Sequence, residues 1–504
     1  MKTWIVMGHR ALFLVLYLLL FNEVLVAKIQ PLIHAEEWFV QGCISQIIAH
    51  DINRDKRQDL LIISHMPAHD SGQRIRQLSI FLNEPETDQG QAHQRLPLFN
   101  AIAFDLADLN GDGNDDFTVL CSDGVYAYLS DSEGYLNDRQ LFIQTESVFP
   151  GADLQRLVRY PFIQDLNGDT LPEILIPTFE NLSIYQKSDS SYQLIRDCLI
   201  RPRYQFLGHK GMDLIIQPPE LHFIDFDGDR RQDLIHLFED HIQIFLNPSL
   251  MNYSNLTLLP DLEFDFGSRR IAHSALDQTS PVSHHIRLHD LNADGYMDCI
   301  VSQAARSGYV HTISQLHLYL NQEGMLASFP DYILTAENYA GEHFIQDLNG
   351  DGLQDLILFN LDIGYTAAAR LILTRRFTHQ YEIYLMREDC HYPSKPDSKL
   401  SVKIDPRERP LVSMLYALSL IEDFNGDGSM DLLVADKKTE WILYPGTPVG
   451  EFNSKEKSRI RTTTLLDQIT VDLNSDGAAD LIQWDKEDAR GAIKLLLSEQ
   501  DSDS

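Results

Sequence analysis

Cysteine is scarce in this sequence of 504 residues, and its placement excludes proteins that depend on closely paired thiols. No two cysteines form a C-x-x-C pair, which excludes zinc-finger and thioredoxin-type motifs. Cys198 and Cys390 fall in segments without a regular pattern, so a disulfide between them stays open, and the odd number leaves at least one thiol free. The chain contains Cys43, Cys121, Cys198, Cys299 and Cys390.

Basic residues are also few. The chain has 41 Lys and Arg against 74 Asp and Glu, which gives a formal net charge of −33. Proteins that bind DNA or RNA need a basic surface that neutralises phosphates. We therefore expect no nucleic-acid partner.

Long apolar runs are missing after the N-terminal region, so no later segment is expected to span a bilayer. The run Ala11–Phe21 follows Lys2 and Arg10, a pattern that indicates a secretory signal peptide over residues 1–27, cut after Ala27. An uncleaved membrane anchor is the alternative, and only then would the protein contact a membrane. We expect a secreted, periplasmic or cell-surface protein.

Catalytic motifs are absent as well. The sequence has no nucleophile elbow, H-E-x-x-H motif, phosphate-binding loop or dinucleotide fingerprint. His284, His285 and His289 lie close together and could form a metal or acid–base site, but the pattern favours exposed polar side chains on a strand. We expect no catalytic residues and no enzyme.

What the sequence has is a nine-residue frame of oxygen donors in eight copies. The clearest copy is Asp347–Asp355, with side-chain oxygens at positions one, three, five and nine and glycine at position six. The starts are 49 to 76 residues apart, a spacing in the range of the repeats that form propeller blades and similar arrays. The copies begin at Asp51, Asp108, Asp165, Asp225, Asp290, Asp347, Asp423 and Asp472.

Oxygen donors at alternating positions are typical of Ca²⁺ sites, because Ca²⁺ takes six to eight hard ligands in flexible geometry. We expect several structural Ca²⁺ ions, and 25 of the 74 acidic residues stand at ligand positions. The candidate ligands are Asp51, Asn53, Asp55, Asp59, Asp108, Asn110, Asp112, Asp116, Asp165, Asn167, Asp169, Glu173, Asp225, Asp227, Asp229, Asp233, Asp290, Asn292, Asp294, Asp298, Asp347, Asn349, Asp351, Asp355, Asp423, Asn425, Asp427, Asp431, Asp472, Asn474, Asp476 and Asp480.

The flanks of the frame predict strands and exclude the EF-hand, which needs a glutamate at position twelve and two helices. No copy has a carboxylate there. Apolar runs such as Asp59–Ile63 follow each frame, and alternating runs such as Leu78–Asn83 and Ile242–Asn247 come next. Each copy therefore reads as strand, loop, strand, turn, strand and a fourth strand.

Four-stranded units repeated radially predict an all-β fold, a β-propeller with eight blades. Too little chain follows Leu497 for a fourth strand, so we expect the N-terminal segment Glu36–Gly42 to complete the last blade. The expected organisation is one propeller over residues 28–500, with a proline-containing insertion near 386–410 and a tail at 501–504.

The repeated D-x-[DN]-x-D-G-x-x-D loops resemble those of the FG-GAP and VCBS repeats of integrin-α-like propellers, over essentially residues 36–500. The resemblance implies seven or eight blades with Ca²⁺ in the loops, and eight loops favour eight blades. It also implies a role in adhesion or recognition.

Some copies depart from the frame. The first, Asp51–Asp59, lacks both glycines and carries three basic residues that oppose a cation, so we expect it to bind most weakly. Thr170 and Arg230 replace the glycine at position six in the third and fourth copies.

Longer connections between the second and third strands of the first, fifth and sixth units offer a candidate partner surface. Arginine and aromatic side chains there suit a carboxylated glycan or an acidic protein patch, while ordinary solvated loops are the alternative. The candidates are Arg74, Arg76, Arg306, Tyr309, Tyr365, Arg375 and Arg376.

We therefore expect a non-catalytic recognition or adhesion scaffold for an extracellular or periplasmic protein or an acidic glycan. A lectin or a polysaccharide-active enzyme on the same propeller is the alternative. The chain has only four Trp, which disfavours a lectin with regular aromatic platforms.

Overall fold

The computed structural model describes residues 34–498 with several breaks, and every named element is a β-strand. The breaks are residues 67–75, 84–89, 148–156, 179, 189–190, 201–202, 208–212, 218, 248–256, 267–281, 308–310, 338, 362–376, 405–418, 438–439 and 463–466. The expected signal segment, residues 1–27, and the tail, residues 501–504, lie outside the described part. No helix in that part is long and apolar enough to cross a membrane.

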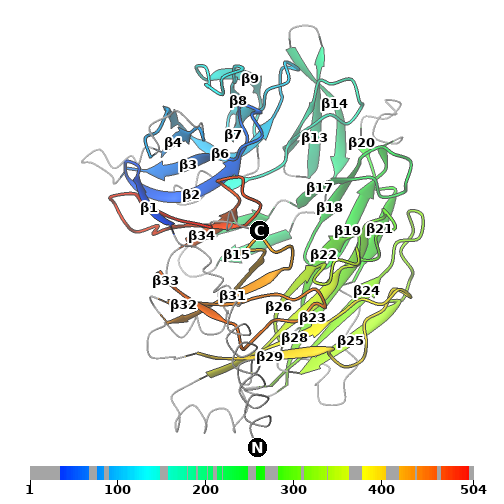
Figure 1. Ribbon diagram of the computed structural model, residues 1–504. Coiled ribbons are helices and arrows are strands. Elements are labelled where there is room, and N and C mark those ends of the chain that lie inside the picture. Colours follow the sequence, from blue (N-terminus) through cyan, green and yellow to red (C-terminus); the bar gives the residue numbers. More distant parts are fainter. Residues whose placement is uncertain are drawn as a thin grey trace, which may run out of the picture.

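Eight antiparallel blades follow one another around a ring, which confirms the predicted eight-bladed propeller (Figure 1). The first four blades are β2 (Cys43–His50), β3 (Asp59–His65), β4 (Arg76–Phe81) and β5 (Gln94–Leu98); β6 (Ala101–Ala107), β7 (Asp116–Cys121), β8 (Gly124–Tyr128) and β9 (Gln140–Gln144); β11 (Ile163–Gln164), β12 (Glu173–Pro177), β13 (Asn181–Ser188) and β14 (Ser191–Leu199); β17 (Glu220–Ile224), β18 (Asp233–Leu237), β19 (His241–Phe245) and β21 (Leu262–Asp265).

The last four blades repeat the same order of strands. They are β22 (Val282–His289), β23 (Asp298–Ser307), β24 (His311–Tyr319) and β25 (Tyr332–Glu337); β26 (Tyr339–Gln346), β27 (Asp355–Leu361), β28 (Phe377–Tyr384) and β29 (Ser398–Ile404); β30 (Ser419–Glu422), β31 (Asp431–Lys437), β32 (Glu440–Tyr444) and β33 (Ser458–Arg461); β34 (Asp467–Val471), β35 (Asp480–Trp484), β36 (Ala492–Leu497) and the N-terminal strand β1 (His34–Phe39).

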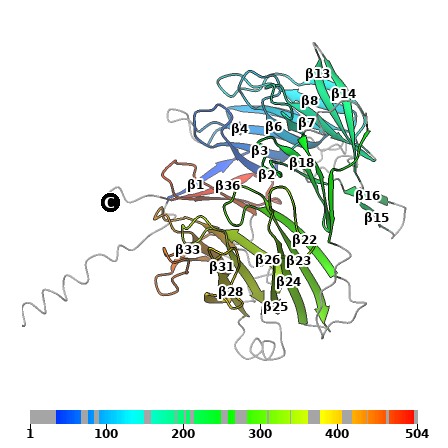
Figure 2. The same ribbon diagram turned by 90° about the vertical axis from the view of Figure 1, so that its right-hand side faces the viewer.

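The two ends of the chain close the ring within the eighth blade, as the sequence predicted. Strand β1 pairs antiparallel with β36, with His34 opposite Leu497 and Phe39 opposite Ala492. Figure 2 shows these two strands side by side although they come from opposite ends of the chain. Ring closure therefore depends on the strand pair β1–β36.

Apolar residues fill every joint between neighbouring blades. Seven clusters of buried side chains cover the eight joints, because one cluster spans the second, third and fourth blades. Trp38 and Phe81 stack at 5.5 Å in the cluster that joins the eighth blade to the first. Second strands such as β12 and β18 are buried along their whole length, because both of their faces pack against neighbouring blades.

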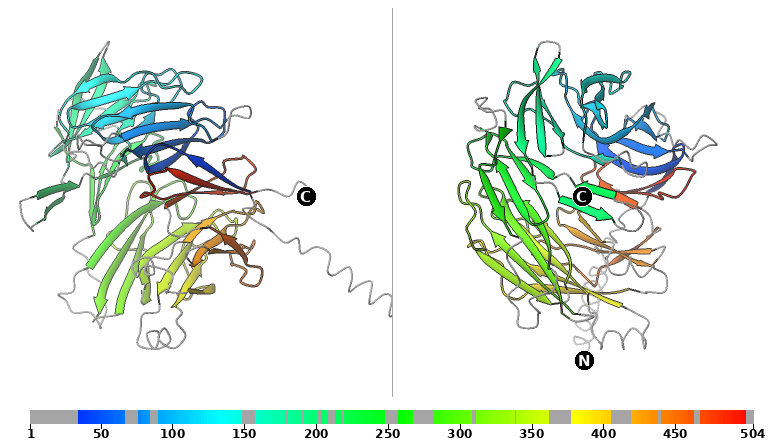
Figure 3. Two further views of the ribbon diagram at one scale, coloured as in Figure 1. Left: turned by 90° about the vertical axis from the view of Figure 1, so that its left-hand side faces the viewer. Right: turned by 180° about the vertical axis from the view of Figure 1, so that it is seen from behind.

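Three short elements extend the regular pattern. Strand β10 (Val158–Arg159) pairs parallel with β6, and β20 (Thr257–Leu258) pairs parallel with β14. The hairpin of β15 (Arg203–Leu207) and β16 (Asp213–Gln217) projects away from the blades between β14 and β17 (Figures 2 and 3). The repeat pattern in the sequence did not predict this hairpin.

Two expectations need correction. The segment near 386–410 is not wholly an insertion, because β29 supplies the fourth strand of the sixth blade and Tyr392 is buried in its core. Cys198 lies buried on β14 and not in an irregular segment, and all five cysteines are free, so Cys198 and Cys390 do not pair.

Candidate metal centres

The eight acidic loops share one backbone turn. Positions four and six have positive φ in every loop, a conformation that glycine adopts at little cost. Ten of these sixteen positions are glycine, and six of the nine non-glycine residues with positive φ occupy the others. Those six are Arg54, Lys56, Thr170, Arg230, Ala293 and Ser475, with φ between 57° and 73°.

The turn arises because side-chain oxygens accept hydrogen bonds from backbone amides within the loop. In the sixth blade, the carboxylate of Asp347 accepts from the amides of Gly350 and Gly352, both at 2.8 Å. The amide of Asp351 donates to Asn349 at 3.0 Å, and Asp351 in turn accepts from Leu353 at 2.9 Å. Positions one, three and five therefore curl around the same turn, and each of their oxygens keeps a lone pair for a cation.

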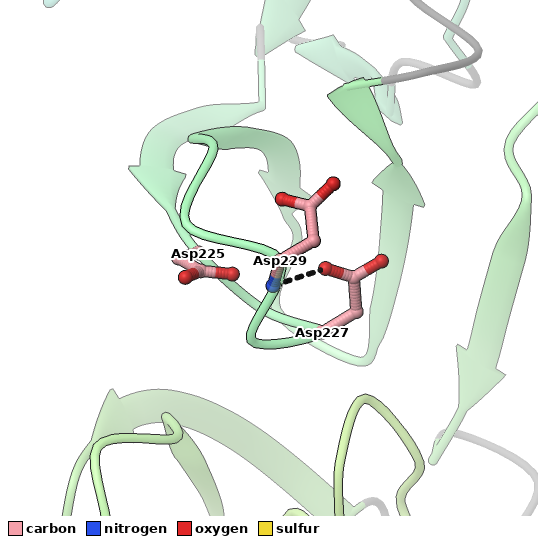
Figure 4. A group of neighbouring side chains, drawn as sticks. All are labelled: Asp225, Asp227 and Asp229. Carbon is pink, nitrogen blue, oxygen red and sulfur yellow. Dashed lines mark hydrogen bonds between the residues drawn. The ribbon is translucent and has the colours of Figure 1, made fainter.

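The loop of the fourth blade shows how closely carboxylates gather. Each of Asp225, Asp227 and Asp229 offers an oxygen, and these oxygens lie within 4.8 Å of one another (Figure 4). The amide of Asp229 donates to Asp227 at 3.1 Å, which holds the turn closed. Three negative charges at this separation repel one another, and a hard oxygen set of this kind fits Ca²⁺. The other seven loops carry Asn at position three.

The acid at position nine has a different environment from the other three donors. Asp355 begins β27, is fully buried, and accepts from the amides of Leu348 and Met386, both at 2.9 Å. Burial raises the pKa of Asp355 to about 6, although these two amides oppose the shift. The same pair of contacts recurs at Asp59, Asp116, Asp233, Asp298, Asp431 and Asp480.

The acid at position nine also has a structural role, which the sequence did not predict. One oxygen binds the amide at loop position two, and the other binds the amide that follows the third strand, so the acid ties three strands of a blade together. Glu173 keeps the first contact at 2.8 Å but uses its other oxygen on Asn167. Its pKa is raised to about 7 by burial.

A second missed feature connects three of the loops to the next blade. Asn247 follows the third strand of the fourth blade, and its side chain donates at 2.6 Å to the carbonyl of Leu166 in the third loop. Asn321 donates in the same way to Phe226 at 2.9 Å, and Asn83 to Leu473 at 2.6 Å across the ring closure. The signal was present in the sequence as a Leu-Asn pair that ends these strands.

The residues proposed from the sequence to bind a partner do not all lie on exposed connections. The register of β3 and β4 puts their connection at the end of the blade opposite the acidic loop. Arg76, however, is buried and donates to the carbonyl of Ala101 at 2.7 Å, so it does not lie on an exposed loop. Arg306 lies on β23 opposite Thr312, because the fifth connection is a lengthened hairpin. Arg74, Tyr309, Tyr365, Arg375 and Arg376 lie outside the described residues.

The clustered histidines lie on β22, the innermost strand of the fifth blade. His285 is exposed and accepts from Arg287 at 3.3 Å, and Arg287 also donates to the carbonyl of His343 at 3.0 Å. His222 lies 3.2 Å from Glu220 on the neighbouring blade. In the described part of the chain these side chains do not meet as a metal-ligand group.

The fold and the loops define the class of protein: a propeller whose blades carry an oxygen-donor loop between their first two strands. Residues 290–358, which span the fifth loop to the middle of β27, match the FG-GAP-like repeat family. The same unit of loop and strands as in this matched segment recurs in all eight blades of the propeller. No curated protein matches the chain.

Several solved structures align with most of the chain at low sequence identity. A lectin from Agrocybe aegerita that recognises non-reducing terminal N-acetylglucosamine is 14% identical, covers 83% of this chain and 92% of its own, and has a TM-score of 0.40. The V. cholerae biofilm matrix protein Bap1 is 12% identical, with coverages of 92% and 88% and a TM-score of 0.28. The WD40 domain of SCAP from fission yeast is 10% identical, with coverages of 85% and 98% and a TM-score of 0.30.

Proposed function

We propose that this propeller is an exported, non-catalytic recognition scaffold whose blades are held together by structural Ca²⁺. The observation that carries the proposal is the shared turn of the eight loops, with positive φ at positions four and six even where glycine is absent. In the seven loops with a formal charge of −2 or lower, a strained turn that is kept even where glycine is absent needs a common reason. Binding of the same cation supplies one.

The ion would be held by the side chains at positions one, three, five and nine of a loop. Bound Ca²⁺ would neutralise carboxylates that otherwise repel one another and would fix the turn between the first two strands. Because the carbonyl at loop position two is bound by the next blade in several joints, a fixed loop also stabilises the joint. A cation that binds only the folded chain adds about 2.7 kcal/mol per site at a 100-fold excess over Kd.

The recognition surface would be the face opposite the acidic loops. The connections between second and third strands would open on that face, and the candidates in and beside them would supply arginine and aromatic groups. Planar guanidinium groups bind carboxylates in bidentate fashion, which suits an acidic glycan or an acidic protein patch. The remaining candidates are Arg74, Arg306, Tyr309, Tyr365, Arg375 and Arg376.

Export is supported by the apolar run Ala11–Phe21 behind two basic residues. Ca²⁺ is abundant outside the cytoplasm, so sites of modest affinity are filled there. The protein would then be secreted, periplasmic or on the cell surface.

Counting the bound ions tests the structural role of Ca²⁺. Purified protein is dialysed against buffer with 1 mM CaCl₂ and analysed for calcium per chain, with a parallel sample dialysed against EGTA. Several ions per chain that EGTA removes are expected. Fewer than about three bound ions would contradict the proposal.

Glycan-array binding tests the recognition role separately. Binding to carboxylated glycans that is lost in Arg375→Ala/Arg376→Ala, with calcium content unchanged, is the expected result. Binding to neutral sugars alone would favour the lectin alternative, and turnover of a polyuronate would favour an enzyme.

A further inference from the structure

The loop of the first blade differs from the other seven in charge. Its three acidic residues, Asp51, Asp55 and Asp59, stand among Arg54, Lys56 and Arg57, so the nine residues have a formal charge of zero. Each of the other loops has a formal charge of −2 or lower. The attraction for a divalent cation that the other loops share is therefore cancelled in this loop by its own side chains.

The first loop nevertheless folds as the others do. Arg54 and Lys56 adopt φ values of 58° and 71° at positions four and six. The amides of Asp55 and Lys56 donate to Asp51 at 3.0 and 2.8 Å, and the amide of Ile52 donates to Asp59 at 3.0 Å. The turn is thus complete in a loop that lacks both the glycines and the net charge of its counterparts.

The side chain of Arg54 shows what holds this loop. Its guanidinium donates at 3.2 Å to Asp115, which is position eight of the second loop, and His50 contacts the other oxygen of Asp115 at 2.9 Å. A Cβ placed on Gly113 would lie 3.5 Å from the same guanidinium. Position four of every other loop is Gly, Ala or Ser, so none of them can reach across the joint in this way.

We propose that the loop at Asp51 binds no Ca²⁺ and that Arg54 and His50, clamped on Asp115, replace the ion as the link between the first and second blades. This inference rests on the proposed calcium role of the other loops. On this proposal, the joint between the first and second blades is held without metal, whereas the other seven loops depend on Ca²⁺. The first two blades would then keep their contact when calcium is withdrawn.

Restoring the consensus turn tests the proposal. Arg54→Gly/Lys56→Gly removes two cations and gives the first loop the glycines of the second. The calcium count per chain, measured by dialysis and metal analysis, is expected to rise by one. Adding Asp51→Ala to this variant should remove the extra ion, and the matched control Ala293→Gly, which restores a glycine in the fifth loop without removing a charge, should leave the count unchanged.

An unchanged count in Arg54→Gly/Lys56→Gly, with circular dichroism showing a folded chain, would overturn the proposal. If the unaltered protein binds no calcium at all, the proposed function fails, which is a distinct result. A second variant tests the clamp: Asp115→Asn should lower the Tm by the same amount in calcium and in EGTA. A loss of Tm confined to the calcium sample would show that Asp115 serves the second loop's ion, and would contradict the clamp.

Discussion

Buried ionisable side chains show at the residue scale which protonation state the fold requires. His236 on β18 is fully buried against Phe245, with ring centroids 4.8 Å apart. Burial lowers its pKa to about 3, although the neighbouring side chain of Gln243 opposes the shift. The folded chain therefore keeps this imidazole neutral, while the unfolded chain protonates it near pH 6.5.

Acid should weaken the fold through His236. Because the pKa is lower in the folded state, the unfolded state binds more protons below pH 6.5, and stability falls as the pH drops through this range. Between pH 6.5 and 5 the contribution is about 2 kcal/mol. Urea unfolding across this range should show a shallower pH dependence for His236→Gln, with exposed His391→Gln as the control. Equal slopes for both variants and the unaltered protein would refute the assignment.

The asparagine that ends several third strands carries a contact between blades. Asn247 is buried, and its amide donates to Leu166 at 2.6 Å and to Gln232 at 3.1 Å. Asn247→Ala leaves two carbonyls without their donor and should lower the free energy of unfolding by about 1–3 kcal/mol. Urea denaturation measures this, and Asn114→Ala, at a loop position without such a contact, should change it by less than about 0.5 kcal/mol. An equal loss of unfolding free energy in both variants would show that the contact between Asn247 and Leu166 does not contribute specifically to stability.

The acidic loop is the unit of repetition at the scale of elements. Its donors are close in sequence, so the spacing of aspartate and asparagine predicted the loops and the strands on both sides of them. The contacts of position nine and of Asn247 depend on which strands and blades become neighbours, and a single repeat does not contain that information. The burial of Arg76 was missed for the same reason, because its acceptor Ala101 belongs to the next blade.

Loops that bind calcium should differ in their response to the loss of a ligand. Asp351→Ala in the sixth loop should lower stability in 1 mM CaCl₂ by about 2.7 kcal/mol, the contribution of one site at a 100-fold excess. Asp55→Ala in the first loop should cost less than about 0.5 kcal/mol, because that loop depends on Arg54. Thermal melts compare the two variants. Equal losses would contradict the ranking of the loops.

Closure of the ring is the main feature at the scale of the whole molecule. The lack of room for a fourth strand after Leu497 predicted that β1 would complete the last blade, and its pairing with β36 confirms this. The hairpin β15–β16 could not be predicted, because it interrupts the repeat and has no counterpart among the described residues of the other blades. The composition of the chain predicted neither ring closure nor the hairpin, and the repeat pattern predicted only ring closure.

Ring closure should depend on Trp38, which stacks on Phe81 in the joint between the last and first blades. Trp38→Ala removes this contact and should lower the free energy of unfolding by about 2–4 kcal/mol. Phe39 lies next to it on β1 but is 50% exposed, so Phe39→Ala should have a much smaller effect. Denaturant unfolding of the two variants makes the comparison, and equal effects would contradict the closure described above.

The measurement that tests the structural role of calcium most directly is a calorimetric melt at a series of free Ca²⁺ concentrations. An ion that binds only the folded ring raises the Tm with each tenfold increase in free Ca²⁺, and Mg²⁺, which prefers a more rigid octahedral site, raises it less. We predict a continuous rise in Tm from EGTA to 1 mM Ca²⁺, with a slope that corresponds to several ions released on unfolding. A Tm that stays constant over the same range would contradict the account.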